Sequence, residues 1–275
     1  MSNLVHFLNG KFVSEDELLI SPRDLGFTRG YAVADFIVTH NHKLFKLPEH
    51  IDRLFNSAEI IGLKIPWSKE QVANWAKETV DKNDTDIEKN IRIFLSGGIS
   101  QSMYQTASPT LVMIVNDYIA QQPSYYENGV KTIAVKFKRQ YPNAKHTNYV
   151  EAIRQRAKHN ERDIEDIIYY DDSQVFEGAG SNLFAVIDNK LVTPKSNIVE
   201  GITRNTLLEI LKLDIPIEVR DFSFDELLHA TEVFLTGSGK GVRGVIEING
   251  NAIGDGKVGE ITKQVMKEYA NYIAS

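Results

Sequence analysis

The sequence predicts a mixed α/β (α+β) fold of two domains. Its 275 residues correspond to about two typical domain lengths. Short β-rich runs alternate with segments whose apolar residues recur at helical spacing. A polar stretch without apolar periodicity separates two such regions. We therefore expect an N-terminal α/β domain over residues 1–117, a linker over 118–128 and a C-terminal domain over 129–275.

The N-terminal half begins with a predicted hairpin, because apolar runs flank the turn dipeptide Asn9-Gly10. Pro48 stands at the start of a predicted helix, since proline is tolerated in the first helical turn. Ser68 and Gln71 have the spacing of a capping box, which predicts a second helix. The expected elements are strands at 4–8, 11–13, 32–40, 90–98 and 110–118, an apolar run at 43–47, and helices at 49–61 and from 68 onward.

The C-terminal half continues the alternation of strands and helices. Asp188-Asn189 predicts a turn between strands, and a second Asn-Gly pair at 249–250 predicts a hairpin. Ser223 with Glu226 predicts a capped short helix. The expected elements are strands at 130–137, 166–172, 174–178, 182–194, 215–222 and 232–236, a hairpin at 244–254, and helices at 147–160, 204–213, 223–230 and 259–273.

Composition excludes several classes of function. The chain is 42% hydrophobic and 25% charged, as in ordinary globular proteins. With 31 basic and 37 acidic residues the net charge is -6, which disfavours binding to nucleic acid. There is no cysteine, so disulfides and thiolate sites are excluded, and we expect a cytoplasmic protein without a membrane partner. His40 and His42 share a strand face, but no third ligand lies nearby, so we expect no metal site.

A glycine-rich stretch follows the strand predicted at 232–236. It contains GxGxxG at Gly239, Gly241 and Gly244, the spacing of a dinucleotide-binding fingerprint. That fingerprint requires a helix directly after it, and here a hairpin is predicted instead. Nucleotide binding of this type is therefore disfavoured, although backbone amides and Ser238 could bind a phosphate.

Three polar features together indicate a pyridoxal phosphate enzyme. Lys145 precedes a predicted helix capped by Thr147, and Glu177 lies between apolar strand residues, where an unpaired carboxylate is costly. Residues 201–203 form a helix start, whose amides and dipole favour a phosphate. Taken singly, Lys145 could be a surface lysine, Glu177 a surface glutamate and residues 201–203 an ordinary helix cap. Together with Arg53 they supply the amine, carboxylate and anion-binding groups that pyridoxal phosphate needs.

A longer signature surrounds these residues. The sequence EGAGSNLF at 177–184 is followed by Thr193-Pro194 and by GITR at 201–204. This pattern resembles the class IV (fold type IV) aminotransferases, which include D-amino acid aminotransferases, branched-chain aminotransferases and 4-amino-4-deoxychorismate lyases. The resemblance runs nearly end to end, with further counterparts at 8–10, 49–66, 145–149, 232–238 and 255–262.

The resemblance implies a transaminase that uses pyridoxal 5'-phosphate, with two α/β domains and the cofactor between them. It makes Lys145 the catalytic lysine of the internal aldimine and Glu177 the partner of the pyridine nitrogen. Family members are homodimers in which a loop of the partner completes each site, and that loop would here lie in 24–36. The implied cofactor-binding residues are Arg53, Lys145, Tyr149, Glu177, Ile202, Thr203 and Ser238.

The sequence departs from the family pattern where the substrate is bound. Ala34 stands where relatives have an aromatic residue. Ser102 and Tyr104 replace the arginine and histidine that bind the substrate carboxylate in the D-amino acid enzymes. A stretch similar to EITP is replaced by residues 240–243. The substrate carboxylate is therefore expected to be bound differently.

Arg29 and Arg92 are the expected substrate-binding residues, because a carboxylate needs a cationic partner and the resemblance brings both near the substrate. Lys240 and Arg243 are the next candidates. We expect a transaminase acting between a D-amino acid and a 2-oxo acid, with an unusual carboxylate site. The alternatives are a branched-chain L-amino acid aminotransferase and a 4-amino-4-deoxychorismate lyase.

Overall fold

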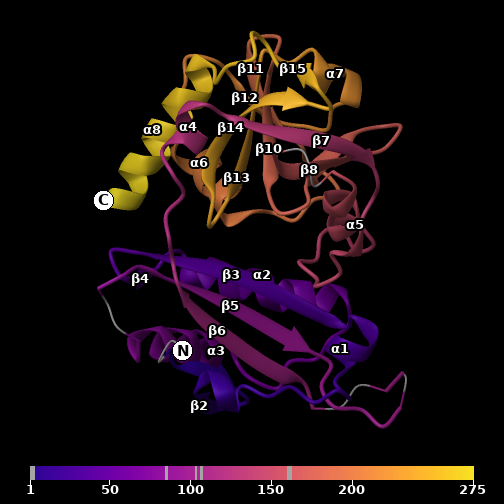
Figure 1. Ribbon diagram of the computed structural model, residues 1–275, viewed down its shortest axis with the longest axis vertical. Helices are drawn as coiled ribbons and strands as arrows, with labels where there is room; N and C mark the ends of the chain where they lie inside the picture. Colours follow the sequence, from indigo (N-terminus) through magenta and orange to yellow (C-terminus); the bar gives the residue numbers. More distant parts are fainter. Residues whose placement is uncertain (1–3, 84–85, 103, 106–107, 160–162) are drawn as a thin grey trace. The chain divides into compact units, whose positions relative to one another are not determined.

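A computed structural model describes residues 4–83, 86–102, 104–105, 108–159 and 163–275 (Figure 1). The chain divides into two compact units, Met1–Ile119 with Asn143–Asn148, and Ala120–Pro142 with Tyr149–Ser275. Both units mix strands and helices, so the predicted α/β class is confirmed. The segment Asn143–Asn148 clusters with the first unit, although it lies within the range assigned above to the C-terminal domain.

The first unit, in its described part, is a six-stranded antiparallel sheet with the order β2-β1-β6-β5-β3-β4. Its strands are β1 (His6–Leu8), β2 (Lys11–Val13), β3 (Ala32–His40), β4 (Lys43–Leu44), β5 (Lys89–Ser96) and β6 (Thr110–Asp117), and its helices are α1 (Leu25–Arg29), α2 (Leu47–Ile60) and α3 (Lys69–Asp81), with a 3-10 turn at Glu15–Glu17.

Local signals account for the boundaries in this unit. Asn9 and Gly10 have φ values of 48° and 90°, the left-handed backbone that a tight hairpin turn requires. At the start of α3, Ser68 Oγ accepts the Gln71 N–H at 3.1 Å while Gln71 Oε1 accepts the Ser68 N–H at 3.0 Å. The predicted hairpin and capping box are thus confirmed.

The core of the first unit lies between the sheet and helices α2 and α3. Strand β3 alternates, so Val33 and Ile37 face this core. Leu54 of α2 and Val72 of α3 pack against them, because both helices carry apolar residues at helical spacing. Burial of this face fixes β3 and α2, the two elements that hold the polar cluster described below.

The second unit, as far as it is described, is a nine-stranded mixed sheet with the order β12-β11-β10-β13-β14-β7-β8-β9, and β15 pairs with β14. Strand β7 runs parallel to both β14 and β8, and β12 runs parallel to β11. Its strands are β7 (Val130–Lys136), β8 (Ile164–Tyr170), β9 (Val175–Gly178), β10 (Asn182–Ile187), β11 (Lys190–Thr193), β12 (Ile217–Val219), β13 (Glu232–Gly237), β14 (Gly241–Ile248) and β15 (Asn251–Ala252), and its helices are α4 (Ser124–Glu127), α5 (Val150–Lys158), α6 (Ile202–Ile210), α7 (Phe224–Leu228) and α8 (Glu260–Ala274).

Both faces of this second sheet are buried near β10. Leu183 joins a cluster that includes Leu227 of α7, whereas its neighbour Phe184 faces Leu207 of α6. The Phe184 ring stacks on Phe234 of β13 with ring centroids 4.9 Å apart. The strand is therefore packed on both sides, between β11 and β13, and β13 leads into the turn that carries Ser238.

One element differs from the sequence-based expectation. The helix predicted from Thr147 begins at Val150, with Tyr149 in the capping position. The Thr147 N–H instead donates to the Ala32 carbonyl at 3.1 Å, so this residue extends the edge of β3 and is not helical. The prediction of Thr147 as a helix cap was therefore wrong, and Asn160, the last residue of the predicted helix, lies outside the described residues.

The linker region also contains structure that its polar sequence did not indicate. Residues Ser124–Glu127 form the single helical turn α4, in which the Glu127 N–H donates to the Pro123 carbonyl at 3.1 Å.

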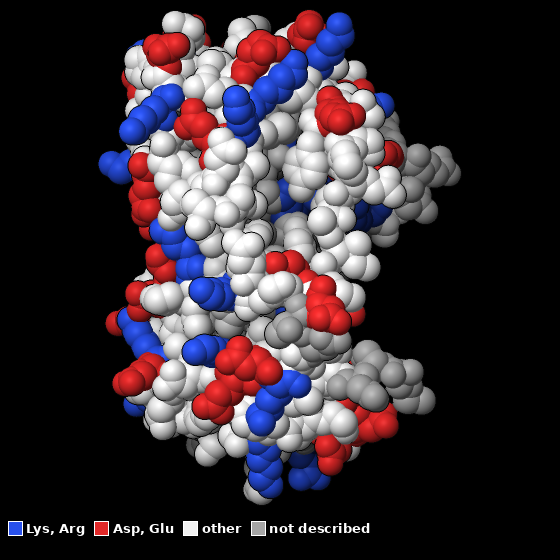
Figure 2. Space-filling model, turned by 90° about the vertical axis from the view of Figure 1, so that its left-hand side faces the viewer, with Lys and Arg blue, Asp and Glu red and all other residues white. Residues whose placement is uncertain are grey.

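On the face drawn in Figure 2, acidic and basic side chains are intermixed over both units. Among the described helices, none combines the length and apolar character needed to cross a membrane.

Candidate active site

The backbone of Lys145 is fixed on two sides in the first unit. The Ala34 N–H of β3 donates to the Lys145 carbonyl at 2.9 Å. The Lys145 N–H donates to Ser57 Oγ of α2 at 3.0 Å. The lysine side chain therefore starts from a backbone anchored to both a strand and a helix, which is how rigid elements position a reactive group.

Asp35, His50 and Arg53 form a buried polar cluster beside this segment. The Arg53 guanidinium donates to both carboxylate oxygens of Asp35, from Nε at 2.9 Å and from Nη2 at 2.8 Å. His50 Nδ1 lies 2.6 Å from Asp35 Oδ1. Burial alone would raise the pKa of Asp35, but Arg53 and His50 outweigh it and hold this pKa below its usual range. The carboxylate is thus ionised and fixes the orientation of Arg53.

His50 is held neutral within the cluster. Burial lowers its pKa, and the positive charges of Arg53 and Lys145 add to this effect, although Asp35 opposes it. Its Nε2 is buried and makes no hydrogen bond within the described residues. Protonation of His50 would place a further positive charge at a buried position beside Arg53, which is costly.

Replacement of His50 by Gln is expected to weaken the acid sensitivity of folding. The pKa of His50 is lower in the folded chain than in the unfolded one, so the unfolded chain binds more protons once the pH falls below about 6.5. The contribution of His50 to the free energy of unfolding is therefore present at neutral pH and is lost on acidification. Urea unfolding at pH values of about 7.5 and 5 measures this loss.

The comparison needs a histidine that is not buried. The control variant is His229→Gln, because 77% of the His229 side chain is exposed. We expect the wild type and the His229 variant to lose the same free energy of unfolding between the two pH values, and His50→Gln to lose less. An equal loss in all three proteins would contradict a neutral, buried His50.

Glu177 is buried in β9 of the second unit and surrounded by donors. Arg139 Nη2 lies 2.7 Å from Glu177 Oε1. The Val199 N–H donates to Oε2 at 3.0 Å, and Asn182 Nδ2 donates to the same oxygen at 3.3 Å. These partners offset the cost of burying the carboxylate.

The start of α6 offers backbone amides to an anion. Gly201 occupies the capping position, and no side chain among the described residues caps this helix. A Cβ at Gly201 would lie 1.9 Å from Asn182 Oδ1, so only glycine fits here. Ile202 and Thr203, the first helical residues, are 7% and 2% exposed. Their amides and the helix dipole suit a phosphate.

Arg204 fixes this helix start to the preceding strand. Its Nε donates to Thr193 Oγ1 at 3.2 Å and its Nη2 to the Pro194 carbonyl at 2.9 Å. Burial lowers the pKa of this guanidinium, which is nevertheless far too basic to lose its proton. Asn182 lies against both Glu177 and the capping Gly201. The structure therefore brings Glu177 close to the amides of α6 that were predicted to bind a phosphate.

Ser238 lies in the tight turn between β13 and β14. The Lys240 N–H closes this turn by donating to the Gly237 carbonyl at 3.0 Å. The chain then continues as strand β14, so the glycine-rich stretch is followed by the predicted hairpin and not by a helix. Arg243, a candidate for the substrate carboxylate, is 1% exposed and pairs with Glu165 at 2.5 Å.

The two arginines predicted to bind substrate are both exposed in the first unit. Arg92 lies on β5 opposite Phe36 of β3, on the face of the sheet away from the core. Arg29 ends α1, and its Nη1 donates to the neighbouring Thr28 carbonyl at 2.7 Å. Tyr149 is half-buried against the apolar cluster around β8 in the second unit.

The partners of the predicted residues were not predicted from the sequence. Asp35 could have been found as a carboxylate in the otherwise apolar run 32–38, and His50 by its i, i+3 spacing from Arg53. Arg139 carries no such signal, because it lies 38 positions from Glu177 in an irregular segment.

The chain is similar in sequence to known proteins of one family. Residues 32–248 match the family model described as amino-transferase class IV. A D-alanine aminotransferase of Staphylococcus aureus is 30% identical over 98% of both chains. A protein of Methanocaldococcus jannaschii, provisionally named a branched-chain-amino-acid aminotransferase, is 30% identical over 96% of this chain and 94% of its own length.

A solved structure has the same fold. The branched-chain aminotransferase of Thermoproteus uzoniensis, solved with norvaline, superimposes with a TM-score of 0.89. It is 26% identical in sequence, and the match covers 99% of this chain and 95% of that one. The fold type that the sequence predicted is therefore confirmed.

Proposed function

This chain belongs to the class IV aminotransferases, which depend on pyridoxal 5'-phosphate, and we propose that it transfers an amino group between a D-amino acid and a 2-oxo acid. The observation that carries the choice of D-amino acids is the similarity to D-alanine aminotransferases over 98% of the chain. The transaminase part is also supported by a lysine with a fixed backbone in the first unit, and by a buried carboxylate and an uncapped helix start in the second.

The residues present fit pyridoxal phosphate. The amides of Ile202 and Thr203, at a helix start that no described side chain caps, are the donors that a dianionic phosphate requires. We propose that these amides, with Arg53 and Ser238, hold the phosphate. Tyr149 is proposed to donate to the phenolic oxygen.

Lys145 and Glu177 are proposed to act on the reacting groups. When bound, pyridoxal phosphate supplies an electron sink for the carbanion that forms next to the amino group. Lys145 Nζ would hold the cofactor and would carry the proton that the reaction moves. Glu177, ordered by Arg139 and Asn182, keeps a proton on the ring nitrogen.

A panel of amino acids tests this function. Purified enzyme is mixed with D-alanine, L-alanine and L-leucine, and the absorbance of the cofactor and the appearance of 2-oxo acid are followed in a single turnover. Our proposal requires the fastest turnover with D-alanine. Preferential turnover of L-leucine would instead establish the second candidate, a branched-chain L-amino acid aminotransferase, which the relative in M. jannaschii favours.

Replacement of Arg92 or Arg29 by Ala is expected to raise KM for the amino acid and for the 2-oxo acid. Both side chains are exposed, and a charge-assisted hydrogen bond to a carboxylate is worth about 1.5 to 3 kcal/mol, or roughly 10- to 100-fold in KM. The cofactor spectrum should not change, since neither residue is proposed to touch the cofactor. Steady-state kinetics with both substrates gives these constants.

Arg154→Ala serves as the matched control, because Arg154 is an exposed arginine of α5 that pairs with Glu151. Its KM values should equal those of the wild type. If neither Arg92→Ala nor Arg29→Ala changes KM, the substrate carboxylate is bound elsewhere.

We also propose a homodimer in which the segment 24–36 contributes to the site of the partner. Its support is the exposure of large apolar side chains in this part of the first unit, where Phe27 is 78% exposed and Leu19 is 75% exposed. The buried Asp24 anchors the segment, since it accepts the Gly26 N–H at 2.7 Å and the Thr110 hydroxyl at 2.7 Å. The lack of cysteine supports a cytoplasmic location.

A further inference from the structure

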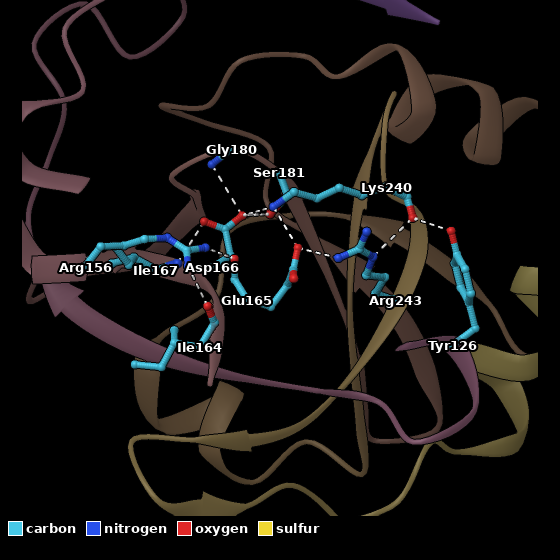
Figure 3. Close-up of polar contacts among 10 residues, drawn as sticks. All are labelled: Tyr126, Arg156, Ile164, Glu165, Asp166, Ile167, Gly180, Ser181, Lys240 and Arg243. Carbon is cyan, nitrogen blue, oxygen red and sulfur yellow. Dashed lines mark hydrogen bonds and ion pairs between the residues drawn. The ribbon is translucent and has the colours of Figure 1, made fainter. Parts of the chain in front are cut away.

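Four charged side chains meet in the second unit, outside the groups around Glu177 and the start of α6. Glu165 and Asp166 come from β8, and Lys240 and Arg243 come from the start of β14 and the turn before it (Figure 3). Lys240 Nζ lies 3.0 Å from Glu165 Oε1 and 3.5 Å from Asp166 Oδ2. Arg243 Nη1 lies 2.5 Å from Glu165 Oε1.

Lys240 is held at both its backbone and its side chain. Its carbonyl accepts the Tyr126 hydroxyl at 3.3 Å and Arg243 Nε at 3.3 Å (Figure 3). Its ammonium pairs with the two carboxylates of β8. Lys240 directly follows Gly239 in the turn that carries Ser238, so these contacts restrict the whole turn.

Asp166 connects this turn to a second one. Its Oδ2 accepts the Ser181 hydroxyl at 2.7 Å and the Gly180 N–H at 3.4 Å, in addition to its contact with Lys240. Gly180 and Ser181 belong to the turn that follows Glu177. The two turns also approach directly, since a Cβ at Gly237 would lie 3.5 Å from the Gly180 carbonyl oxygen.

Asp166 is suited to this connecting position. It is 4% exposed, and its second oxygen accepts the Ile167 N–H at 2.8 Å, so its carboxylate is fixed on β8. Lys240 has 30% of its side chain exposed and gives Asp166 a charged contact with the other turn. Removal of the Lys240 charge should therefore loosen the link without opening the core.

We propose that Asp166 and Lys240 are positioning residues that hold the turn 237–241 against the turn 178–181. The inference rests on the proposed function, in which Ser238 holds the phosphate and Glu177 the ring nitrogen. Both residues would contact the same cofactor molecule, so the two contacts would persist together only if the two turns keep their separation. The ion pair maintains that separation.

Three variants test the proposal. Lys240→Met removes the charge but keeps the length of the side chain, and Lys240→Arg restores the charge. Lys190→Met is the matched control, because Lys190 is also a partly exposed lysine of this unit and pairs with Glu218 at 2.7 Å. In the sheet it pairs with Ile187 at the end of β10 opposite to Asn182, the end where both turns lie. Each full-length protein is prepared with saturating pyridoxal phosphate.

Amide hydrogen exchange gives the direct measurement. Lys240→Met should exchange faster than the wild type in peptides that cover both 237–241 and 178–181, whereas Lys240→Arg and Lys190→Met should match the wild type. The dissociation constant for pyridoxal phosphate, from its absorbance, should rise about fivefold in Lys240→Met, as expected for a partly buried ion pair, and should return toward the wild-type value in Lys240→Arg.

Unchanged exchange at 178–181 in Lys240→Met would overturn the proposal, as would an unchanged dissociation constant for pyridoxal phosphate. Asp166→Asn, which removes the charge from the other side, should reproduce the exchange pattern if Lys240→Met folds poorly. A wild-type protein that binds no pyridoxal phosphate would refute the proposed function, whereas the exchange measurement would still decide whether the two turns are linked.

Discussion

Lys145→Ala is expected to have no measurable transaminase activity and no visible absorbance from covalently bound cofactor. The variant loses the amine that we propose binds the cofactor and carries the proton. General acid-base catalysis alone contributes roughly 10²- to 10⁴-fold, and loss of covalent catalysis adds to this. Single-turnover rates with D-alanine and the absorbance spectrum measure the two losses separately.

The control is an exposed lysine of the second unit. Lys158 is an exposed residue near the end of α5, and Lys158→Ala should retain wild-type rate and spectrum. Near wild-type turnover in Lys145→Ala with saturating pyridoxal phosphate would show that another lysine reacts. Urea unfolding of both variants, compared with the wild type, verifies that the difference does not arise from misfolding.

Glu177→Gln is expected to slow the proton abstraction by about 10²- to 10³-fold, the usual effect of removing one preorganised electrostatic contact. The amide keeps the size of the side chain but cannot keep a proton on the ring nitrogen as a carboxylate does. The phosphate contacts are unchanged, so the dissociation constant of the cofactor should change far less than the rate. The rate comes from single turnover with D-alanine deuterated and undeuterated at its α-carbon.

Glu151→Gln provides the comparison for this variant, because Glu151 pairs with an exposed arginine on α5. It should have the wild-type rate. A Glu177→Gln protein that reacts at the wild-type rate but binds the cofactor weakly would assign Glu177 to binding and not to catalysis.

Features encoded by neighbouring residues were predictable from the sequence. The Asn9-Gly10 turn, the Ser68 capping box and the Ser223 capping box with Glu226 were all predicted, and each appears in the structure. Such signals depend on hydrogen bonds within three or four residues, so the local sequence contains both partners.

Features that depend on distant residues were not predictable. Thr147 has the sequence of a helix cap, but its N–H pairs with Ala32, more than 100 positions earlier, and this contact overrides the local preference. The partners of Glu177 and Lys240 could not be predicted for the same reason. Nothing near Glu177 indicates Arg139, and nothing near Lys240 indicates Asp166, because these ion pairs form only when separate segments are brought together.

The residue that binds the cofactor can be identified directly. The purified enzyme is treated with borohydride, which reduces a carbon–nitrogen double bond between a lysine and the cofactor to a stable bond, and is then digested and analysed by mass spectrometry. The account predicts a phosphopyridoxyl group on the peptide that contains Lys145, and on no other lysine peptide. The same group on a different lysine, or no modified peptide from a protein saturated with pyridoxal phosphate, would contradict it.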